Sequence, residues 1–413
     1  MTLAVWPMIA ILIGLALYVV LGGADFGAPI WQVLSGRGPR AERIREYAHD
    51  QMAPVWEANH VWLIFVLTVM WTAYPTAFGS VASTLSIPLF AAGLGIVIRG
   101  AAYALRSGVE SPDQIRRIDR ISAVASVLTP FALGTVVGGI ASRRVPVGNA
   151  AGNLFTSWFN ATSLIIGALA VASAAYMAAV FLAADAMRRD ESDLAGEFRW
   201  RALASGVVAG ALAVAGLIVV RADVRVLFDR LLDGAGLAAV IVSAVAGMGT
   251  LALVWSRRYE PARYSAAVAV AAIIAGWALA QQPVLLRGLT IEQAAAPHDT
   301  LVAIIVAIVG GGLILFPSLA LLFRLALGGR LGHGVEAAGD VATARGVVEA
   351  SSRGLLARTA GACLVVGIGF LNVAEAGWAH AIGVAALFAF IVLGFFAAVP
   401  ALLPGRDERA AAA

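Results

Sequence analysis

The sequence predicts an all-α, polytopic membrane protein with about eleven transmembrane helices. The first observation behind this prediction is composition. Of 413 residues, 61% are hydrophobic and only 13% are charged, and the mean hydropathy is +0.87. Soluble domains are about half apolar and a quarter charged, so a water-soluble globular protein is excluded. The second observation is the length of the apolar runs, and the third is the placement of the arginines.

Eleven apolar runs follow one another along the chain. A bilayer core of about 30 Å needs roughly 20 apolar residues per helix. The first run has no basic segment before it and no small-residue cleavage site, so we expect a retained helix there rather than a signal peptide. The predicted spans, in order, are residues 5–31, 54–75, 80–105, 120–141, 155–184, 202–221, 236–255, 264–281, 299–323, 359–375 and 379–402.

Arginine is the only strong base, because the chain has 29 arginines and no lysine. Cytoplasmic loops of membrane proteins carry the excess of positive residues. Counted with the span-end residues Arg120 and Arg221 that border them, the odd-numbered loops and the C-terminal tail hold 22 of the arginines, and the even-numbered loops hold 6. This alternation supports eleven spans, with the N-terminus outside and the C-terminus inside. It also excludes a nucleic-acid-binding face, because the basic residues mark the membrane topology.

The long polar connection after the ninth span divides the chain. We expect a transmembrane domain over residues 1–325, a cytoplasmic loop over 326–358, an additional transmembrane hairpin over 359–402 and a cytoplasmic tail over 403–413. The single cysteine, Cys363, lies in an apolar run. Neither a disulfide framework nor a thiolate metal site is therefore available.

Four ionisable residues interrupt the first three spans: Asp25, Glu57, His60 and Arg99. Such a group costs about 2.5 to 3.5 kcal/mol inside a span, so it needs a partner, a cavity or a function. In the predicted orientation all four fall in the cytoplasmic third of the membrane, with Asp25 and Arg99 each about 10 Å from the inner end of their span. Glu57 and His60 share one helix face, because they are three residues apart.

Two interpretations of these four residues stay open from their spacing alone. Two carboxylates, a histidine and an arginine at one depth suit a proton relay or a counter-ion site for a charged cofactor. They equally suit a satisfied polar cluster that holds three helices together, with Glu57 reaching the interface. Asn59, which lies between Glu57 and His60, fits either interpretation.

Two N-terminal motifs carry a family resemblance. Residues 22–27 read GGADFG, and residues 53–63 read APVWEANHVWL. They are similar to the motifs DGFD(L/M)G and APxW(D/E)(G/A)NxVWL of subunit II of the cytochrome bd-type quinol oxidase family. The arginine-rich first loop, Tyr74-Pro75 and Arg99 add to the likeness. Weaker similarity continues to about residue 325, so the nine spans of the family correspond to the first nine here.

The resemblance implies a non-haem subunit of a terminal oxidase that reduces oxygen to water with electrons from quinol. Its expected partner is a larger subunit I, which carries haems b and d and the quinol site. This chain alone is then expected to hold no catalytic residue, metal or cofactor, although a quinone, lipid or small accessory subunit could bind to it. The implied location is the bacterial cell membrane, which the chain crosses several times.

The resemblance also implies roles for individual residues. The acid matching Glu57 is associated in the family with proton delivery from the cytoplasm, and the tryptophan matching Trp62 with the entrance of an oxygen tunnel. We therefore expect an oxygen tunnel or subunit interface at Trp56 and Trp62. The expected proton pathway comprises Glu57, Asp25, His60 and Asn59, with Arg99 as the counter-charge.

The sequence departs from the family pattern in three places. Gly22 replaces the first acid of its motif, His60 stands where a short polar residue is usual, and residues 359–402 have no counterpart. A hydrogen bond across the subunit interface is the expected role of His60, rather than haem ligation.

Two alternatives remain at this point: a secondary transporter that uses the Asp25, Glu57 and Arg99 cluster, and a purely structural scaffold. Transporters usually carry broken helices near the midplane in two inverted repeats. The present cluster is off-centre and confined to one half of the chain, which favours the oxidase subunit.

Overall fold

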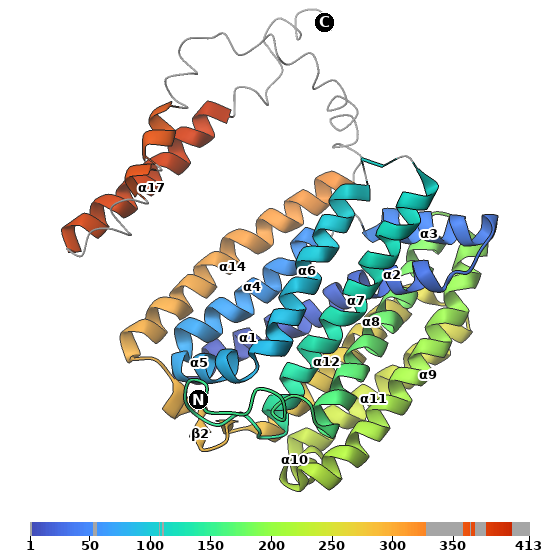
Figure 1. Cartoon of the computed structure of the whole chain (residues 1–413), viewed down its shortest axis with the longest axis horizontal. Coiled ribbons are helices and arrows are strands. Elements are labelled where there is room, and N and C mark those ends of the chain that lie inside the picture. The colour runs from blue at the N-terminus through green and yellow to red at the C-terminus, as the bar shows by residue number, and fades with distance from the viewer. Residues whose placement is uncertain are drawn as a thin grey trace, which may run out of the picture. The chain divides into compact units, whose positions relative to one another are not determined.

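The computed structural model describes residues 2–52, 56–106, 108–109, 111–327, 358–363, 365–367 and 377–398, which are mainly α-helical (Figure 1). The chain divides into two compact units, Met1–Leu313 and Ile314–Ala413. In the second unit, the helix α17 covers Gly377–Ala398, within the predicted hairpin. The last predicted segment, residues 403–413, lies outside the described residues.

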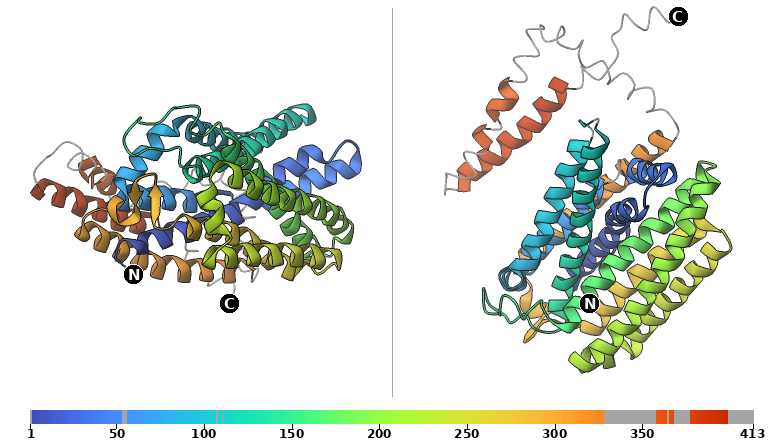
Figure 2. Two further views of the ribbon diagram at one scale, coloured as in Figure 1. Left: turned by 90° about the horizontal axis from the view of Figure 1, so that it is seen from below. Right: turned by 45° about the vertical axis from the view of Figure 1, so that its right-hand side comes forward.

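The helices of the first unit run antiparallel to one another in a bundle (Figures 1 and 2). Two short strands interrupt the helical chain near its end. The elements are α1 (Val5–Leu17), η1 (Tyr18–Gly22), α2 (Gly23–Leu34), α3 (Pro39–Met52), α4 (Trp56–Ala73), α5 (Pro75–Thr84), α6 (Ser86–Arg106), α7 (Pro112–Ala141), α8 (Ala161–Arg188), α9 (Ser192–Asp223), α10 (Arg225–Leu231), α11 (Gly234–Trp255), α12 (Tyr259–Gln281), β1 (Val284–Leu286), β2 (Leu289–Thr290), α13 (Ile291–Ala294) and α14 (His298–Leu327).

The predicted all-α polytopic membrane class is confirmed by these helices. Within the described part of the chain, seven helices are long and apolar enough to cross a membrane, starting with the continuous helix Val5–Leu34. Shorter apolar helices at Asn59–Ala73 and His298–Leu313 lie in the second and ninth predicted spans. The total of eleven spans and the orientation of the two termini stay predictions.

Two boundaries differ from the sequence prediction. The third predicted span begins inside α5, and the chain breaks at Leu85 before α6 starts. Pro88 has no N–H for the carbonyl of Thr84, which favours this break. The fifth predicted span begins with a loop, because Asn160 caps α8 by accepting a hydrogen bond from the Ser163 N–H at 3.0 Å. An Asn at this position ends the preceding loop and starts the helix.

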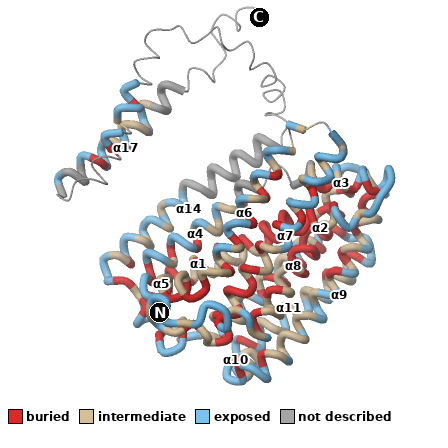
Figure 3. Tube along the Cα trace, viewed as in Figure 1, coloured by how far each residue is buried: buried red, intermediate tan, exposed pale blue. Residues whose placement is uncertain are grey.

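The core of the first unit lies around α8, which packs against α2, α7, α9 and α12. Figure 3 shows the buried residues gathered on α2, α7 and α8. Small side chains make this packing possible, because they let helix backbones approach closely. On α8 they include Ala174, Ala178, Ala179 and Ala183, each at most 2% exposed.

The first loop contains a helix that the span analysis did not predict. Helix α3 begins at Pro39 and packs against α2 and α8 at one end of the bundle (Figure 1). Its buried residues Ala41, Ile44 and Ala48 recur at intervals of three and four. This is the pattern of an amphipathic helix that lies against a core.

Candidate functional site

The centre of the candidate site is an ion pair between Asp25 on α2 and Arg99 on α6. The two side chains form two hydrogen bonds, from Arg99 Nη1 to Asp25 Oδ2 at 2.7 Å and from Arg99 Nη2 to Asp25 Oδ1. Asp25 is 0% exposed and Arg99 is 7% exposed. The sequence analysis placed these charges at one depth, and the structure joins them in a bidentate pair.

Pro29 explains why Arg99 also binds the main chain of α2. In a regular helix the N–H of residue 29 would bond to the carbonyl of residue 25, but proline has none. The Asp25 carbonyl instead accepts a hydrogen bond from Arg99 Nη2 at 3.2 Å. The Arg99 guanidinium also lies 4.8 Å from the centroid of the Phe26 ring. Arg99 therefore satisfies both the carboxylate and the carbonyl that Pro29 leaves free.

On α4, Asn59 and His60 contact the first helix where it widens into the π-helical turn η1. Asn59 Nδ2 donates a hydrogen bond of 3.3 Å to the carbonyl of Leu21, and the side chain is 5% exposed. The His60 ring centroid lies 5.9 Å from that of Phe26 and 6.2 Å from that of Tyr18. π-Helical turns are often found at functional sites. Two of the expected site residues thus hold α4 against this turn.

The structure describes the side chain of one of the three remaining expected residues, Trp62, but not those of Trp56 and Glu57. Trp62 packs beside the buried cluster of Tyr18, Phe26 and Ala174. Trp56 and Glu57 form the first turn of α4, but their side chains lie outside the described residues. The backbone therefore puts Glu57 two residues before Asn59 and three before His60 on the same helix, and the role of its carboxylate remains a prediction.

A cavity of about 30 Å³ extends from the Asp25–Arg99 pair and is lined by α2, α3, α6 and α7. About 10 to 15 Å³ is enough for one water molecule. Its other polar lining residues are Gln32, His49, Tyr103, Arg106, Asp119 and Ser122. Arg106 Nε lies 3.0 Å from Asp119 Oδ1, and the His49 and Tyr103 rings stack with centroids 5.1 Å apart.

The sequence analysis missed the residues of this cavity outside the ion pair. His49 was counted in the first loop, although the buried positions of α3 carry a helical period that could have revealed its helix. Asp119 immediately precedes the predicted fourth span, whereas α7 begins at Pro112 and includes it. The sequence does contain a signal that α7 begins earlier, because a serine followed by a proline, here Ser111-Pro112, is a common way to begin a helix.

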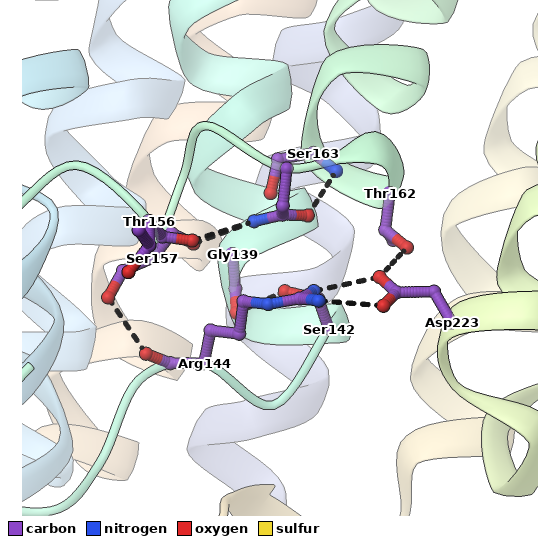
Figure 4. A network of polar contacts seen from close by, with 9 residues as sticks. Gly139, Ser142, Arg144, Thr156, Ser157, Thr162, Ser163 and Asp223 are labelled. Atoms are coloured by element: carbon purple, nitrogen blue, oxygen red, sulfur yellow. Dashed lines mark hydrogen bonds and ion pairs between the residues drawn. The ribbon is translucent and has the colours of Figure 1, made fainter. Parts of the chain in front are cut away.

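A second polar network lies at the opposite end of the bundle from α3 (Figures 1 and 4). Arg144, after α7, donates two hydrogen bonds of 2.7 Å to Asp223 at the end of α9. These bonds raise the pKa of the Arg144 guanidinium above its usual value. Thr162 Oγ1 donates to Asp223 at 2.5 Å, which ties α8 to the same point. The network fixes the connection between α7 and α8 to α9, and the bonds account for its charges without a ligand.

Among the described residues, no three His, Cys, Asp or Glu side chains come together as a group that could hold a metal ion. The Asp25–Arg99 pair also has no orphaned carboxylate, since both oxygens accept hydrogen bonds from the guanidinium. Its chemistry is therefore electrostatic: it fixes two opposite charges at the end of a polar cavity inside an apolar bundle.

The comparisons with known proteins decide the family. The family described as cytochrome bd terminal oxidase subunit II matches residues 3–326 of this chain. The chain belongs to this family. The matched region contains the Asp25–Arg99 pair, η1 and the cavity, so the site described above belongs to the subunit II fold.

Relatives and a solved structure agree with the family. The cytochrome bd ubiquinol oxidase subunit 2 of Bacillus subtilis is 26% identical over 119 residues, which cover 29% of this chain and 34% of the relative. The putative cytochrome bd menaquinol oxidase subunit II of the same organism is 22% identical, covering 56% of this chain and 67% of the relative. A chain of the bd oxidase structure from Geobacillus thermodenitrificans has a TM-score of 0.62 and 25% identity, covering 79% of this chain and 99% of that one.

These findings confirm the resemblance and the fold class derived from the sequence. This subunit II is a multi-pass protein of the bacterial plasma membrane. The first Bacillus subtilis relative is matched over about a third of its own length. Residues 359–402, where the sequence predicts an additional hairpin, lie beyond the matched residues.

Proposed function

We propose that this chain is the non-haem subunit of a bd-type oxidase, in which quinol supplies the electrons that reduce oxygen to water. Its partner is a haem-bearing subunit I, which holds haems b and d and the quinol site. The support is family membership over residues 3–326 together with the likeness to a chain of a solved bd oxidase. Membership in this family also argues against a secondary transporter, the alternative that the cluster of Asp25, Glu57 and Arg99 had raised.

Within that complex we propose that this chain delivers protons from the cytoplasm toward the partner, with Glu57 as the titrating acid. Oxygen reduction consumes protons, and a carboxylate is a suitable carrier when it can alternate between its charged and neutral forms. The observation that carries this proposal is the buried Asp25–Arg99 pair at the end of a polar cavity, beside Phe26, whose ring contacts the His60 ring of α4. Such a cavity costs stability in an apolar bundle and is therefore best explained by a function.

We propose different roles for the two acids, Asp25 and Glu57. Asp25 is held by two hydrogen bonds from Arg99, so its carboxylate is the partner of a buried guanidinium. In the proposed arrangement Asp25 balances the charge of Arg99, whereas Glu57 carries the proton. Asn59 and His60 hold α4 against η1 and so set the position of the turn that carries Glu57.

The test is the variant Glu57→Gln in the purified complex, with the haem content checked by absorbance. Glutamine keeps the size of the side chain but cannot carry a proton, so we expect oxygen consumption to fall about tenfold or more. Glu292→Gln is the matched control, because Glu292 is an exposed acid of α13. A wild-type rate in Glu57→Gln with normal haem content would remove the proton role and leave a structural scaffold.

A further inference from the structure

We propose that protons enter this subunit through the cavity between α2, α3, α6 and α7, and that His49 collects them at its mouth. This inference rests on the proposed function, because it supplies the entrance for the route that ends at Glu57. Neither of the two sequence motifs quoted for the resemblance, residues 22–27 and 53–63, includes His49 or Asp119. The two residues come from α3 and from the start of α7.

The lining residues give the cavity a direction. Asp25 and Gln32 are seven residues apart on α2, and so are Arg99 and Arg106 on α6. Seven residues are about two helical turns, so each pair shares a helix face over about 10 Å. The Asp25–Arg99 pair therefore forms one end of the cavity, and Gln32 with the Arg106–Asp119 pair forms the other.

Close helix contacts flank the part of the cavity that holds Asp25 and Arg99. A Cβ on Gly95, one turn before Arg99, would lie 2.3 Å from Thr129 Oγ1 on α7. A Cβ on Gly27 would lie 2.0 Å from the Ala174 carbonyl oxygen on α8. Close packing of α6 on α7 and of α2 on α8 therefore surrounds the pair. In the proposed route, protons reach the pair from the α3 side, because α3 lies at the end of the bundle.

His49 is the lining residue suited to exchange protons with the cytoplasm. Histidine has an unperturbed pKa of about 6.5, so it takes up and releases a proton near neutral pH. The ring is half-buried and stacks on Tyr103, which fixes its orientation in the cavity wall. In the proposed step, one ring nitrogen of the imidazole takes a proton from bulk water. The imidazolium then releases a proton to water in the cavity, which returns the ring to its neutral form.

Asp119 is the positioning residue of this entrance. Its side chain is 8% exposed, and its Oδ1 lies 3.0 Å from Arg106 Nε in an ion pair. The charged groups that face the cavity are Asp25, Arg99, Arg106 and Asp119, while His49 and Tyr103 complete its titratable lining. The Asp119 charge offsets Arg106, whose unbalanced cation would otherwise disfavour the protonated form of His49.

The experiment measures proton uptake by the complete complex with a pH-indicating dye after mixing with oxygen. His49→Gln keeps a polar side chain but cannot be protonated, and we expect uptake about threefold slower or more, with recovery when free imidazole is added. His298→Gln is the matched control, because His298 is 77% exposed at the start of α14. A His49→Gln variant with wild-type uptake, or a slow one that imidazole does not restore, overturns the proposal.

Asp119→Asn tests the positioning role through the pH profile of uptake. Loss of this negative charge disfavours the imidazolium, so the midpoint of the profile should move to lower pH. Asp113→Asn, an exposed acid in the first turn of the same helix, should leave the midpoint unchanged. An unchanged midpoint in Asp119→Asn overturns the role of Asp119.

Slow uptake in Glu57→Gln with normal uptake in His49→Gln would overturn the entrance alone, whereas normal uptake in both would overturn the proposed function as well.

Discussion

At the scale of single residues, Arg99 makes more hydrogen bonds to the first helix than any other described side chain of the site. It pairs with both carboxylate oxygens of Asp25 and with the carbonyl that Pro29 leaves free. A buried ion pair adds little net stability, because the loss of hydration offsets the attraction between the charges. Removal of one partner is different, since it leaves the other charge buried without compensation.

This asymmetry predicts the behaviour of variants of the pair. Asp25→Asn should lower the free energy of unfolding by about 3 to 5 kcal/mol, because Arg99 would keep its charge without a counter-ion. The double variant Asp25→Asn/Arg99→Gln should recover part of this loss. Thermal unfolding of the purified complex, followed through the haem absorbance of the proposed partner subunit, measures both effects.

The control for these variants is a surface pair. Asp229→Asn removes an acid that is 62% exposed and lies 3.9 Å from Arg225. Exposed pairs contribute about 0 to 1 kcal/mol, so the unfolding midpoint should hardly move. Additive losses in the Asp25 and Arg99 variants would contradict the bidentate pairing.

The sequence could predict that Asp25 and Arg99 lie at one depth in the membrane, but it could not predict the cavity beside them. Asp25 and Arg99 are conspicuous because each interrupts a long apolar run, and their distances from the predicted span ends give a common depth. His49 and Asp119 lie in polar surroundings, where an ionisable residue attracts no notice. Only the tertiary packing of α3 and α7 brings them to the cavity.

At the scale of elements, α2 and α8 approach each other through one glycine of the first motif. A Cβ on Gly27 would meet the Ala174 carbonyl oxygen at 2.0 Å, whereas a Cβ on Gly23 would have its nearest neighbour at 3.7 Å. The two glycines are about one turn apart on the same helix, and the space that an added Cβ would find before it meets α8 is much smaller at Gly27 than at Gly23. The motif residue Gly27 is thus required by packing.

We therefore predict opposite outcomes for two alanine substitutions. Gly27→Ala should cost about 1 to 3 kcal/mol, because the helices must separate to accept the methyl group. Gly23→Ala should be neutral or slightly stabilising, since alanine favours a helix by up to about 1 kcal/mol over glycine. Thermal unfolding of the two variant complexes compares them directly. Equal midpoints would contradict the close approach of α2 and α8.

Long apolar helices were predictable from the sequence, and the connections were only partly so. A run of about 20 apolar residues leaves few alternatives to a membrane helix. Helix α3 has a polar composition, and its fold depends on three small or apolar residues that face α2 and α8. The start of α8 depends on the local hydrogen bond of Asn160, which composition does not reveal.

At the scale of the whole molecule, the long apolar helices differ widely in how far they are buried. Over their most apolar stretch, α9 and α11 are only 11% buried, against 56% for α8. Side chains such as Ile218 on α9 and Met248 on α11 are more than 60% exposed. Lipid or a partner subunit must cover such faces, because they cannot remain in water. This is the expected surface of a subunit in a membrane complex.

The orientation of this molecule decides which side supplies the protons. The proposed entrance lies beside α3, and the arginines of the first loop predict that α3 faces the cytoplasm. The network of Arg144 and Asp223 lies at the opposite end, which should then face outward. Orientation and proton source are therefore linked, and one measurement tests both.

Cysteine labelling of intact cells provides this measurement in a Cys363→Ser background. Val147→Cys places a thiol on the exposed loop between α7 and α8, and a membrane-impermeant maleimide should label it from outside. Arg37→Cys, on the exposed turn before α3, should be labelled only after the membrane is opened. Because the cavity opens toward α3, labelling of Arg37→Cys in intact cells would place its mouth outside and contradict cytoplasmic proton uptake through His49.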